Sequence, residues 1–161
     1  MRTRSFRLTL DCTEEYMTTR VILVSCVKSK RTSVSAAQNL YTSDLFLSMR
    51  IYARQNSDQW FILSAEHGVL RPDEVVAPYE KTLNKMLKAE RLEWAAKVQY
   101  RLLELIPPGA SIVVLAGERY REGVVPFLRE RGYSVEVPMI GLKFGFQLRW
   151  LKEKTRNESP C

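Results

Sequence analysis

The alternation of short apolar runs with helical patterns is the feature that most limits what this chain can fold into. Four apolar runs lie at residues 21–25, 60–64, 111–116 and 133–137. Apolar residues recur at helical spacing in the segments 44–55, 84–106, 118–131 and 142–154. Strands that alternate with helices form a parallel sheet with helices on both faces. The sequence therefore predicts an α/β fold with three layers, α/β/α, around a mostly parallel, four-stranded central sheet.

The length of the chain predicts one domain. With 161 residues, of which 45% are hydrophobic, the chain is long enough to bury a full core. We expect an N-terminal extension at 1–19 that can be flexible, a single domain at 20–154 and a C-terminal tail at 155–161. Met17 lies just before the first strand and can be the true start.

The sequence also limits where the protein works and what it can bind. It has no apolar run of membrane-spanning length and no signal peptide, so we expect a cytoplasmic protein that binds no membrane. Its three cysteines lack paired spacing, and there is only one histidine, so no zinc site can be assembled from them. We therefore predict no metal and no cofactor, and no obligate protein partner is evident.

The charge of the chain favours an anionic partner. The formal net charge is +7, and the segment 20–50 holds five basic residues against the single acidic residue Asp44. Such a cluster near the end of a strand favours phosphate. Excess charge of this size also occurs in proteins that bind no nucleic acid, and the cluster can equally be a solvated loop.

Polar loops follow the predicted strands. Ligands of parallel sheets bind beyond the carboxyl ends of the strands. We expect the segments 25–41, 64–80, 116–121 and 138–143 to converge there. The convergence predicts one site rather than an extended surface.

The segment after the first strand has the residues of an anion-binding loop. It reads Ser25-Cys26-Val27-Lys28-Ser29-Lys30-Arg31. Backbone N–H groups, hydroxyls and lysines together can wrap an anion, although the glycines of a Walker loop are missing. Cys26 can be a nucleophile, but a small packed thiol is the commoner role.

The segment after the second strand holds the candidate acid–base groups. His67 can transfer a proton or donate a hydrogen bond, or it can simply pack in a turn. Asp73, Glu74 and Glu80 are the carboxylates expected to face the cleft. A carboxylate near a sugar C1 can activate water or stabilise an oxocarbenium-like transition state. Asp73 follows Pro72 and can instead cap a turn.

Aromatic residues and glycines complete the candidate site. Tyr41, Tyr79 and Tyr120 can stack on a flipped base, or they can belong to the core or its rim. Gly117 permits close approach of the backbone to a ligand at the start of a helix. Glu118 can be a catalytic base or an ordinary acid of the first helical turn.

These segments together resemble a large bacterial family of small uncharacterised domains over residues 20–152. The motifs that carry the resemblance are Ser-Cys-x-Lys-x-Lys from Ser25, Leu40-Tyr41-Thr42-Ser43-x-Leu45-Phe46, Leu63-Ser64-Ala65-x-His67-Gly68-x-Leu70-x-Pro72-Asp73, Pro78-Tyr79-Glu80, Ala116-Gly117-x-x-Tyr120 and Pro138-x-x-Gly141-Leu142. Some of them also resemble the family of the DNA-binding peroxide-stress protein YaaA and, more distantly, the glycosylase-like domain of archaeosine synthase. These relatives imply a fold like that of uracil-DNA glycosylase.

The resemblance implies a function in base excision. We expect a phage-defence DNA glycosylase that removes glucosylated hydroxymethylcytosine from double-stranded viral DNA and leaves an abasic site. The water-activating motif Gly-x-Asp-Pro-Tyr and the His-Pro-Ser loop of uracil-DNA glycosylases are absent. The catalytic carboxylate must therefore come from elsewhere, and Asp73 and Glu80 are the predicted choices.

The predicted site residues fall into three groups. Catalytic roles are expected for Asp73, Glu80 and His67. Base or nucleotide binding is expected for Ser25, Cys26, Tyr41, Ser64, Tyr79, Gly117 and Tyr120. Binding of DNA phosphates is expected for Lys28, Lys30, Arg31, Arg121 and Lys143.

Two other classes of function fit the same residues. The first is an N-glycosidase that acts on free modified cytidine nucleotides, which needs the carboxylate and the phosphate site but no DNA groove. The second is a DNA-binding stress-response module without turnover, for which Asp73→Asn and Glu80→Gln leave binding unchanged. A glycosylase that uses a lysine nucleophile, with a coupled lyase step, is a further variant.

Overall fold

The structure of the protein, a computed structural model, describes residues 18–156. Its main sheet has five strands in the order β4-β3-β1-β6-β7. Their bounds are β1 Arg20–Ser25, β3 Gln59–Ser64, β4 Gly68–Leu70, β6 Ser111–Leu115 and β7 Ser134–Glu136. β1, β3, β6 and β7 run parallel, whereas β4 runs antiparallel to β3. A separate pair joins β2 (Ser35–Ala36) to β5 (Val75–Val76).

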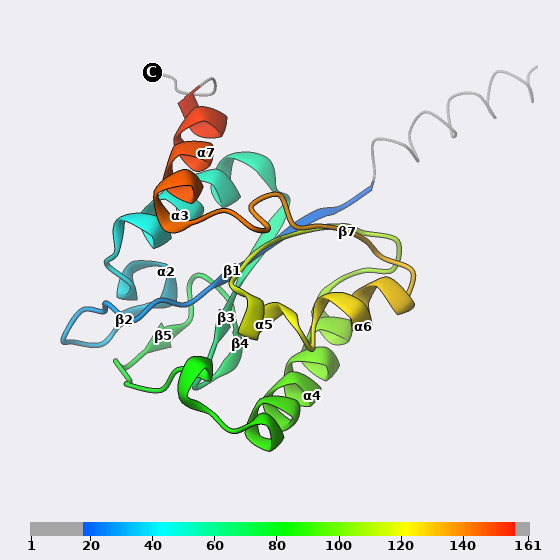
Figure 1. Cartoon of the computed structure of the whole chain (residues 1–161), viewed down its shortest axis with the longest axis horizontal. Helices are drawn as coiled ribbons and strands as arrows, with labels where there is room; N and C mark the ends of the chain where they lie inside the picture. Colours follow the sequence, from blue (N-terminus) through cyan, green and yellow to red (C-terminus); the bar gives the residue numbers. More distant parts are fainter. Residues whose placement is uncertain (1–17, 157–161) are drawn as a thin grey trace, which may run out of the picture.

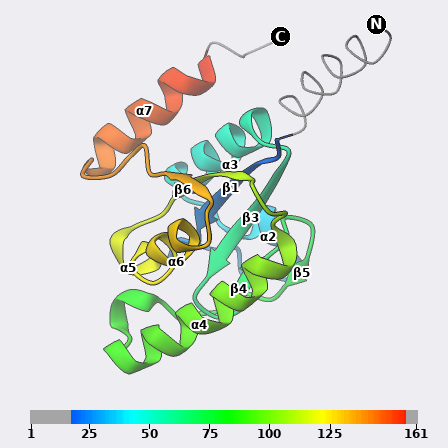
Figure 2. The ribbon, with the colours of Figure 1, turned by 90° about the vertical axis from the view of Figure 1, so that its right-hand side faces the viewer.

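Helices cover both faces of this sheet (Figures 1 and 2). On one face α3 (Asp44–Asn56) packs against α7 (Phe144–Arg156). On the opposite face lie α4 (Lys88–Leu105), α5 (Glu118–Arg121) and α6 (Val125–Glu130). Two short helices, α2 (Ala37–Leu40) and the 3₁₀ helix η1 (Leu83–Lys85), lie in the loops. The predicted α/β fold with a mostly parallel central sheet is confirmed.

The predicted number of strands was wrong because β4 was read as part of a loop. All four predicted strands are present, and β4 is the fifth. β4 has only three residues, which is too short to show a period in the sequence. It begins at Gly68, whose φ of 78° allows the chain to turn back along β3.

Two predicted helices are shorter than expected. The helix predicted at 84–106 begins only at Lys88, because Met86 and Leu87 have extended backbone after η1. The helix predicted at 118–131 is divided into α5 and α6. Pro126 stands in the first turn of α6, where a missing N–H costs no hydrogen bond. Sequence periodicity does not register a break of three residues.

The core explains why the apolar runs become strands. β1 lies between β3 and β6, and its residues Val21–Val24 have no exposed surface. Ser43 is the N-cap of α3. Its hydroxyl accepts a hydrogen bond from the Phe46 N–H at 3.1 Å, and this bond stabilises the first turn of the helix. Phe46, Met49 and Ala53 of α3 are then buried over the sheet. A strand buried on both faces has to be apolar throughout.

The path of the chain creates a switch point between β1 and β6. The chain passes from β1 to its neighbour β3, and later returns past β1 to form β6 and then β7. The two crossovers therefore diverge at the carboxyl ends of β1 and β6. In sheets of this kind a crevice for ligands opens at that position.

The expected extension and tail lie mainly outside the described part of the chain. The range that the structure describes includes the residues 20–154 of the predicted domain, and α7 continues to Arg156. The expected features at residues 1–17 and 157–161 lie outside the described residues. None of the helices within 18–156 has the length and apolar character needed to cross a membrane.

Candidate active site

A small cavity of about 380 Å³ lies at the switch point. Its walls come from three of the four segments that were expected to converge. These are Ser25–Val27 after β1, residues 115–121 after β6 and residues 139–142 after β7. Ligand pockets have volumes of roughly 300–1,000 Å³, so this cavity suits one small group, such as a single base or nucleotide. We call it the switch-point cavity.

Cys26, which follows β1, contacts the segment that follows β6. Its Sγ lies 3.3 Å from the Oη of Tyr120 in α5. Its backbone N–H donates to the Leu63 carbonyl at 2.9 Å, which keeps β1 paired with β3 past the formal end of the strand. Burial, and after it the neighbouring Cys26, raise the pKa of Tyr120 above its ordinary value. The tyrosine is therefore a neutral hydrogen-bonding group beside the thiol.

A chain of hydroxyls lies beside Cys26. Tyr41 and Tyr79 share a hydrogen bond of 2.6 Å between their hydroxyls. The Ser64 hydroxyl donates to the Tyr79 Oη at 2.8 Å and accepts from the His67 backbone N–H at 3.0 Å. Tyr41 comes from the end of α2, Ser64 from β3 and Tyr79 from the loop after β5. The second predicted segment therefore lies next to Cys26 through this cluster, but none of its residues lines the switch-point cavity.

These hydroxyls remain protonated at neutral pH. Burial raises the pKa of Tyr41 to about 12, against an ordinary value near 10. The pKa of Tyr79 is raised further, by burial first and then by the nearby Cys26 and Tyr41. The cluster therefore donates and accepts hydrogen bonds without charge. Tyr41 and Ser64 are buried, so these hydroxyls join the loops behind the strand ends to one another.

Lys30 brings a positive charge to the tyrosines. Its Nζ lies 4.5 Å from the centre of the Tyr79 ring and 5.8 Å from that of Tyr41. The same ammonium group donates to the Lys28 carbonyl at 3.1 Å. A cation over the face of a tyrosine is stabilised by the ring electrons. The predicted phosphate-binding Lys30 is thus brought to the site, while Lys28 and Arg31 are exposed in the loop.

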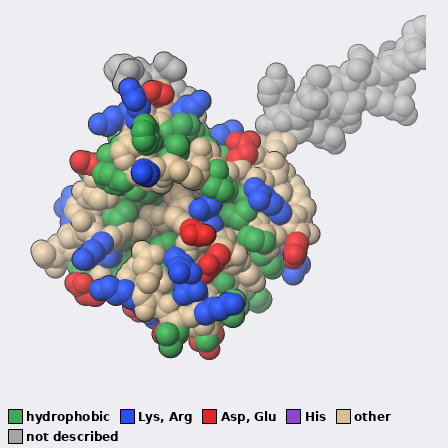
Figure 3. All heavy atoms as spheres, in the orientation of Figure 1, with side chains coloured by type: hydrophobic (Ala, Val, Ile, Leu, Met, Phe, Trp, Pro, Cys, Tyr) green, Lys and Arg blue, Asp and Glu red, His purple; other side chains and the backbone are tan. Residues whose placement is uncertain are grey.

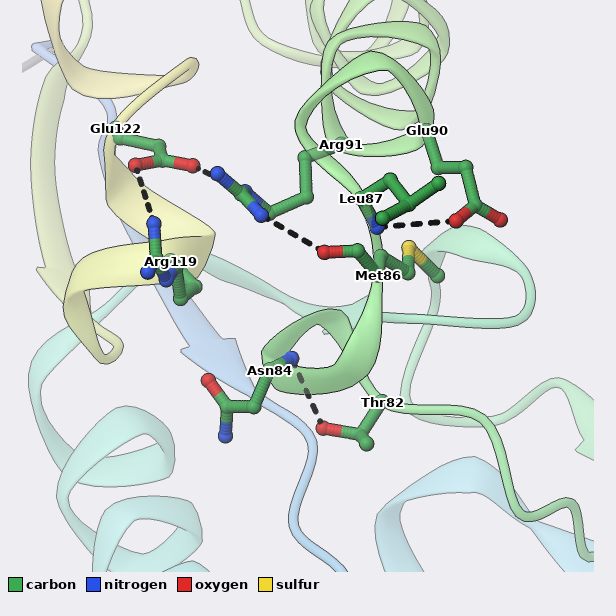
Figure 4. A network of polar contacts seen from close by, with 8 residues as sticks. All are labelled: Thr82, Asn84, Met86, Leu87, Glu90, Arg91, Arg119 and Glu122. Atoms are coloured by element: carbon green, nitrogen blue, oxygen red, sulfur yellow. Dashed lines mark hydrogen bonds and ion pairs between the residues drawn. The ribbon is translucent and has the colours of Figure 1, made fainter.

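Arg121 reaches the switch-point cavity from α5. It lines the cavity, and within the described chain its Nε is buried without a hydrogen-bond partner. Ion pairs hold α5 in place, because the Arg91 Nε of α4 lies 2.7 Å from a Glu122 oxygen and Arg119 lies 3.6 Å from the other (Figure 4). Arg91 also donates to the Met86 carbonyl at 2.8 Å, which ties the loop after η1 to this network.

The carboxylates do not lie where the sequence predicts them. Asp73 lines a separate surface groove together with Gln59 and Trp60. The antiparallel β4 carries the chain back along β3, so Asp73 lies toward the amino end of that strand. Glu80 is exposed after Tyr79 and does not line the switch-point cavity. Glu118, at the start of α5, is the one Asp or Glu among the described residues that lines it.

His67 and Lys143 lie outside the switch-point cavity. The His67 ring packs edge-on against Tyr79, with ring centres 5.5 Å apart, and faces a second groove of about 730 Å³ along α4. That groove holds both signs of charge, including Glu90, Glu93 and Lys97, and so favours no anion. Lys143 lines a shallow groove on α7 instead of the switch-point cavity. Five of the predicted binding residues line the switch-point cavity, and the others do not. Those that line it are Ser25, Cys26, Gly117, Tyr120 and Arg121, and those outside its lining include Tyr41, Ser64 and Tyr79.

Sequence reasoning missed Trp94 and Asn84. The Trp94 Nε1 donates to the Ser64 carbonyl at 2.8 Å, and its ring packs edge-on against Tyr120. Trp94 stands at helical spacing among apolar residues, so the sequence indicates a core residue only. A buried indole N–H needs a hydrogen-bond acceptor, and free carbonyl groups occur where strands end. This requirement is the one signal in the sequence that could have placed Trp94 near the end of a strand. Asn84 lines the cavity from η1, a helix too short for sequence periodicity to show.

The charge around the site is spread over the surface. Figure 3 shows basic side chains distributed over this face of the molecule, with acidic side chains among them. Within residues 18–156, no three side chains of His, Cys, Asp or Glu gather in a way that could hold a metal ion. The groups available for ligand binding are thus neutral hydroxyls, a thiol, one carboxylate and the basic side chains.

Comparisons with known proteins identify a family without a known activity. A protein family described as a family of unknown function (DUF6884) matches residues 21–153. The uncharacterized protein YfjM of Bacillus subtilis (strain 168) is 36% identical over 64 residues, which are 36% of this chain and 43% of that protein. The match thus spans less than half the length of this relative. No solved structure matches the chain. Because the family match covers most of its length, the chain belongs to the DUF6884 family.

Proposed function

We propose that this protein is a DNA glycosylase that hydrolyses the N-glycosidic bond of a modified base, with glucosylated hydroxymethylcytosine in phage DNA as its substrate. The observation that carries the proposal is the switch-point cavity. It is of a size for one base, and its lining includes the hydroxyls of Ser25 and Tyr120, the guanidinium of Arg121 and, as its one carboxylate among the described residues, Glu118. The resemblance of the strand-end motifs to glycosylase-like domains, and the three-layer α/β architecture expected of them, support the same conclusion.

The hydroxyls of the cavity suit a glucosylated base. A sugar presents many hydroxyls that both donate and accept hydrogen bonds, as do the cavity-lining side chains of Ser25 and Tyr120. Since these groups are neutral, they bind a neutral sugar without the cost of desolvating a charge. An enzyme that acts on a base must take it out of the duplex, and a cavity for a flipped base meets that need.

In the proposed mechanism, Glu118 takes the catalytic role that was predicted for Asp73 and Glu80. In this mechanism a water molecule attacks C1′ of the deoxyribose, and the bond from C1′ to the base nitrogen breaks. The Glu118 carboxylate accepts the proton of that water, and the base leaves with the electron pair and is protonated by solvent. Arg121 holds a neighbouring phosphate and stabilises the anionic leaving base.

The decisive experiment uses duplex oligonucleotides that contain cytosine, uracil, hydroxymethylcytosine or glucosylated hydroxymethylcytosine. The protein is incubated with each duplex without added metal, and alkali then reveals abasic sites. We expect cleavage only at the glucosylated base. If every duplex is bound and none is cleaved, the protein is a DNA-binding module without turnover.

Two matched carboxylate variants locate the chemistry. Glu118→Gln removes the carboxylate of the switch-point cavity, whereas Asp73→Asn removes one in a separate groove. We expect Glu118→Gln to lower single-turnover cleavage by at least about 100-fold and Asp73→Asn to leave it unchanged. The opposite result would move the reaction to the groove beside β3.

The small volume of the cavity favours a second candidate, an N-glycosidase of free modified cytidine nucleotides. A nucleotide with its own phosphate fits beside Arg121 without any DNA groove. Release of free base from the nucleoside monophosphate, with no cleavage of the duplex, would select this function.

A further inference from the structure

Three arginines make hydrogen bonds with residues of α2, and none of them lines the switch-point cavity. Arg50 and Arg54 stand one turn apart on α3, and both donate hydrogen bonds to residues of α2. The backbone N–H of Arg31 donates to the Leu40 carbonyl at the end of the same helix, at 2.8 Å. The short helix thus brings all three residues to one place. We call them the arginine cluster.

The positive charge of the arginine cluster is not compensated. Within residues 18–156, no Asp or Glu forms an ion pair with any of the three. Arg50 donates through Nη1 to the Gln38 carbonyl at 2.9 Å and to the Asn39 side-chain oxygen at 3.0 Å. Arg54 donates to the side-chain oxygen of Gln38 at 2.5 Å. These partners are neutral, so they hold the side chains in place and leave their charge intact.

The cluster also has an unused donor. The Nε of Arg50 is buried and has no partner among the described residues. Burial, and then the charges of Arg54 and Arg31, lower the pKa of Arg50. Like charges held together cost free energy, and so does a buried donor without an acceptor. An anion bound by the exposed side chains of Arg31 and Arg54 offsets the repulsion between these like charges.

We propose that Arg31, Arg50 and Arg54 form a second anion site, which binds a backbone phosphate of DNA. Guanidinium groups bind phosphate oxygens through two parallel N–H donors, which makes phosphate the fitting anion. None of the three residues lines the switch-point cavity, so this phosphate lies outside the nucleotide that reacts. The identity of the partner as DNA rests on the proposed function, whereas the anion site rests on the cluster itself.

The test measures how salt weakens the binding of an unmodified DNA duplex. Fluorescence anisotropy gives the binding constant of the full chain at several salt concentrations. Each lost phosphate contact lowers the slope of log K against log salt by about 0.9. We expect Arg31→Gln and Arg54→Gln each to lower the slope by about that amount, and Arg54→Lys, which keeps the charge, to restore most of it. A wild-type slope in both glutamine variants overturns the proposal.

Controls separate this result from folding and from catalysis. Arg101 lies on α4 and pairs with Glu104 at 3.4 Å, so Arg101→Gln should leave the slope unchanged. We expect no cleavage of unmodified DNA, and binding to it is measured without any turnover, so the slope is independent of whether the glycosylase proposal holds. A last control measures the melting temperature in the presence of inorganic phosphate. If phosphate raises the melting temperature of the wild type but not of Arg54→Gln, while their DNA slopes agree, the cluster binds a small phosphate and the DNA proposal fails.

Discussion

At the scale of single residues, Tyr79 is the centre of the hydroxyl chain. Its hydroxyl contacts both Tyr41 and Ser64, and its ring lies between Lys30 and His67. The sequence left open whether this tyrosine stacks on a base or belongs to the core. The structure gives it a half-buried position with two hydrogen bonds, so its hydroxyl has a structural part as well.

Tyr79→Phe tests whether the Tyr79 hydroxyl stabilises the fold. The variant leaves the hydroxyls of Tyr41 and Ser64 inside the protein without this partner, and we expect the free energy of unfolding to fall by about 1–3 kcal/mol. Urea denaturation measures the change. Tyr100→Phe is the matched control, since Tyr100 is 70% exposed and should tolerate the loss of its hydroxyl. Equal stability of both variants and the wild type would mean that the hydroxyl chain contributes nothing.

The raised pKa of Tyr41 predicts how stability depends on pH. In the unfolded chain this tyrosine releases its proton near pH 10, whereas in the folded protein it does so near pH 12. Between these values the folded state binds more protons, so stability is complete below pH 10 and falls as the pH rises toward 12. We expect urea denaturation to show a shallower alkaline decline for Tyr41→Phe. A parallel decline in both proteins would contradict the assigned pKa.

At the scale of secondary structure, the turn between α5 and α6 depends on a close approach to α4. A Cβ built on Gly123 would lie 2.6 Å from the Ala95 Cβ, a distance that side chains do not tolerate. The absence of a side chain at Gly123 therefore allows these helices to form one layer. This layer carries Arg121 and Glu118 to the switch-point cavity.

Gly123→Ala should disturb this packing. We expect a loss of about 1–3 kcal/mol in the free energy of unfolding, because α5 and α4 must move apart. The control is Gly145→Ala in α7, where nothing lies within 4 Å of the added Cβ. It should stabilise the protein by about 0.5–1 kcal/mol, as expected for alanine in a helix. Recovery of stability in Gly123→Ala/Ala95→Gly would assign the loss to this one contact.

The helices also show what sequence periodicity can and cannot predict. α3 was predicted to within one residue, because Ser43 caps it and Phe46 and Met49 mark its buried face. α5 and α6 were predicted as one helix, because a short turn leaves the apolar spacing almost unchanged. Sequence periodicity predicts long regular helices and strands, but it does not reveal short interruptions in them.

At the scale of the whole molecule, the four parallel strands of the sheet were predictable, and the antiparallel β4 and the placement of the carboxylates were not. Buried runs such as Ile22–Val24 are visible as apolar sequence, and parallel strands bring their loops to one end. The meeting of Cys26 with Tyr120 follows from that rule. The position of Asp73 depends on β4, since one reversal of the chain moves it to the other end of β3.

Stability should be graded from the centre of the sheet to its edge. Val114 is fully buried in β6, whereas Val135 is half-buried in the edge strand β7. We expect Val114→Ala to lower the free energy of unfolding by about 2–3 kcal/mol, and Val135→Ala by about 1 kcal/mol. Urea denaturation of the two variants measures both losses. Equal losses would mean that β7 packs as tightly as the centre.

The two edge strands also bear on how molecules of this protein meet one another. β4 and β7 have only three residues each. The exposed Arg129 places its cation on β7 by donating to the Val135 carbonyl at 3.1 Å. Long, uncharged sheet edges recruit strands from other molecules and aggregate. Both edges are short, and one of them carries the charge of Arg129, so they offer few unpaired backbone groups to a strand of another molecule, and the sheet should resist polymerisation even at high protein concentration.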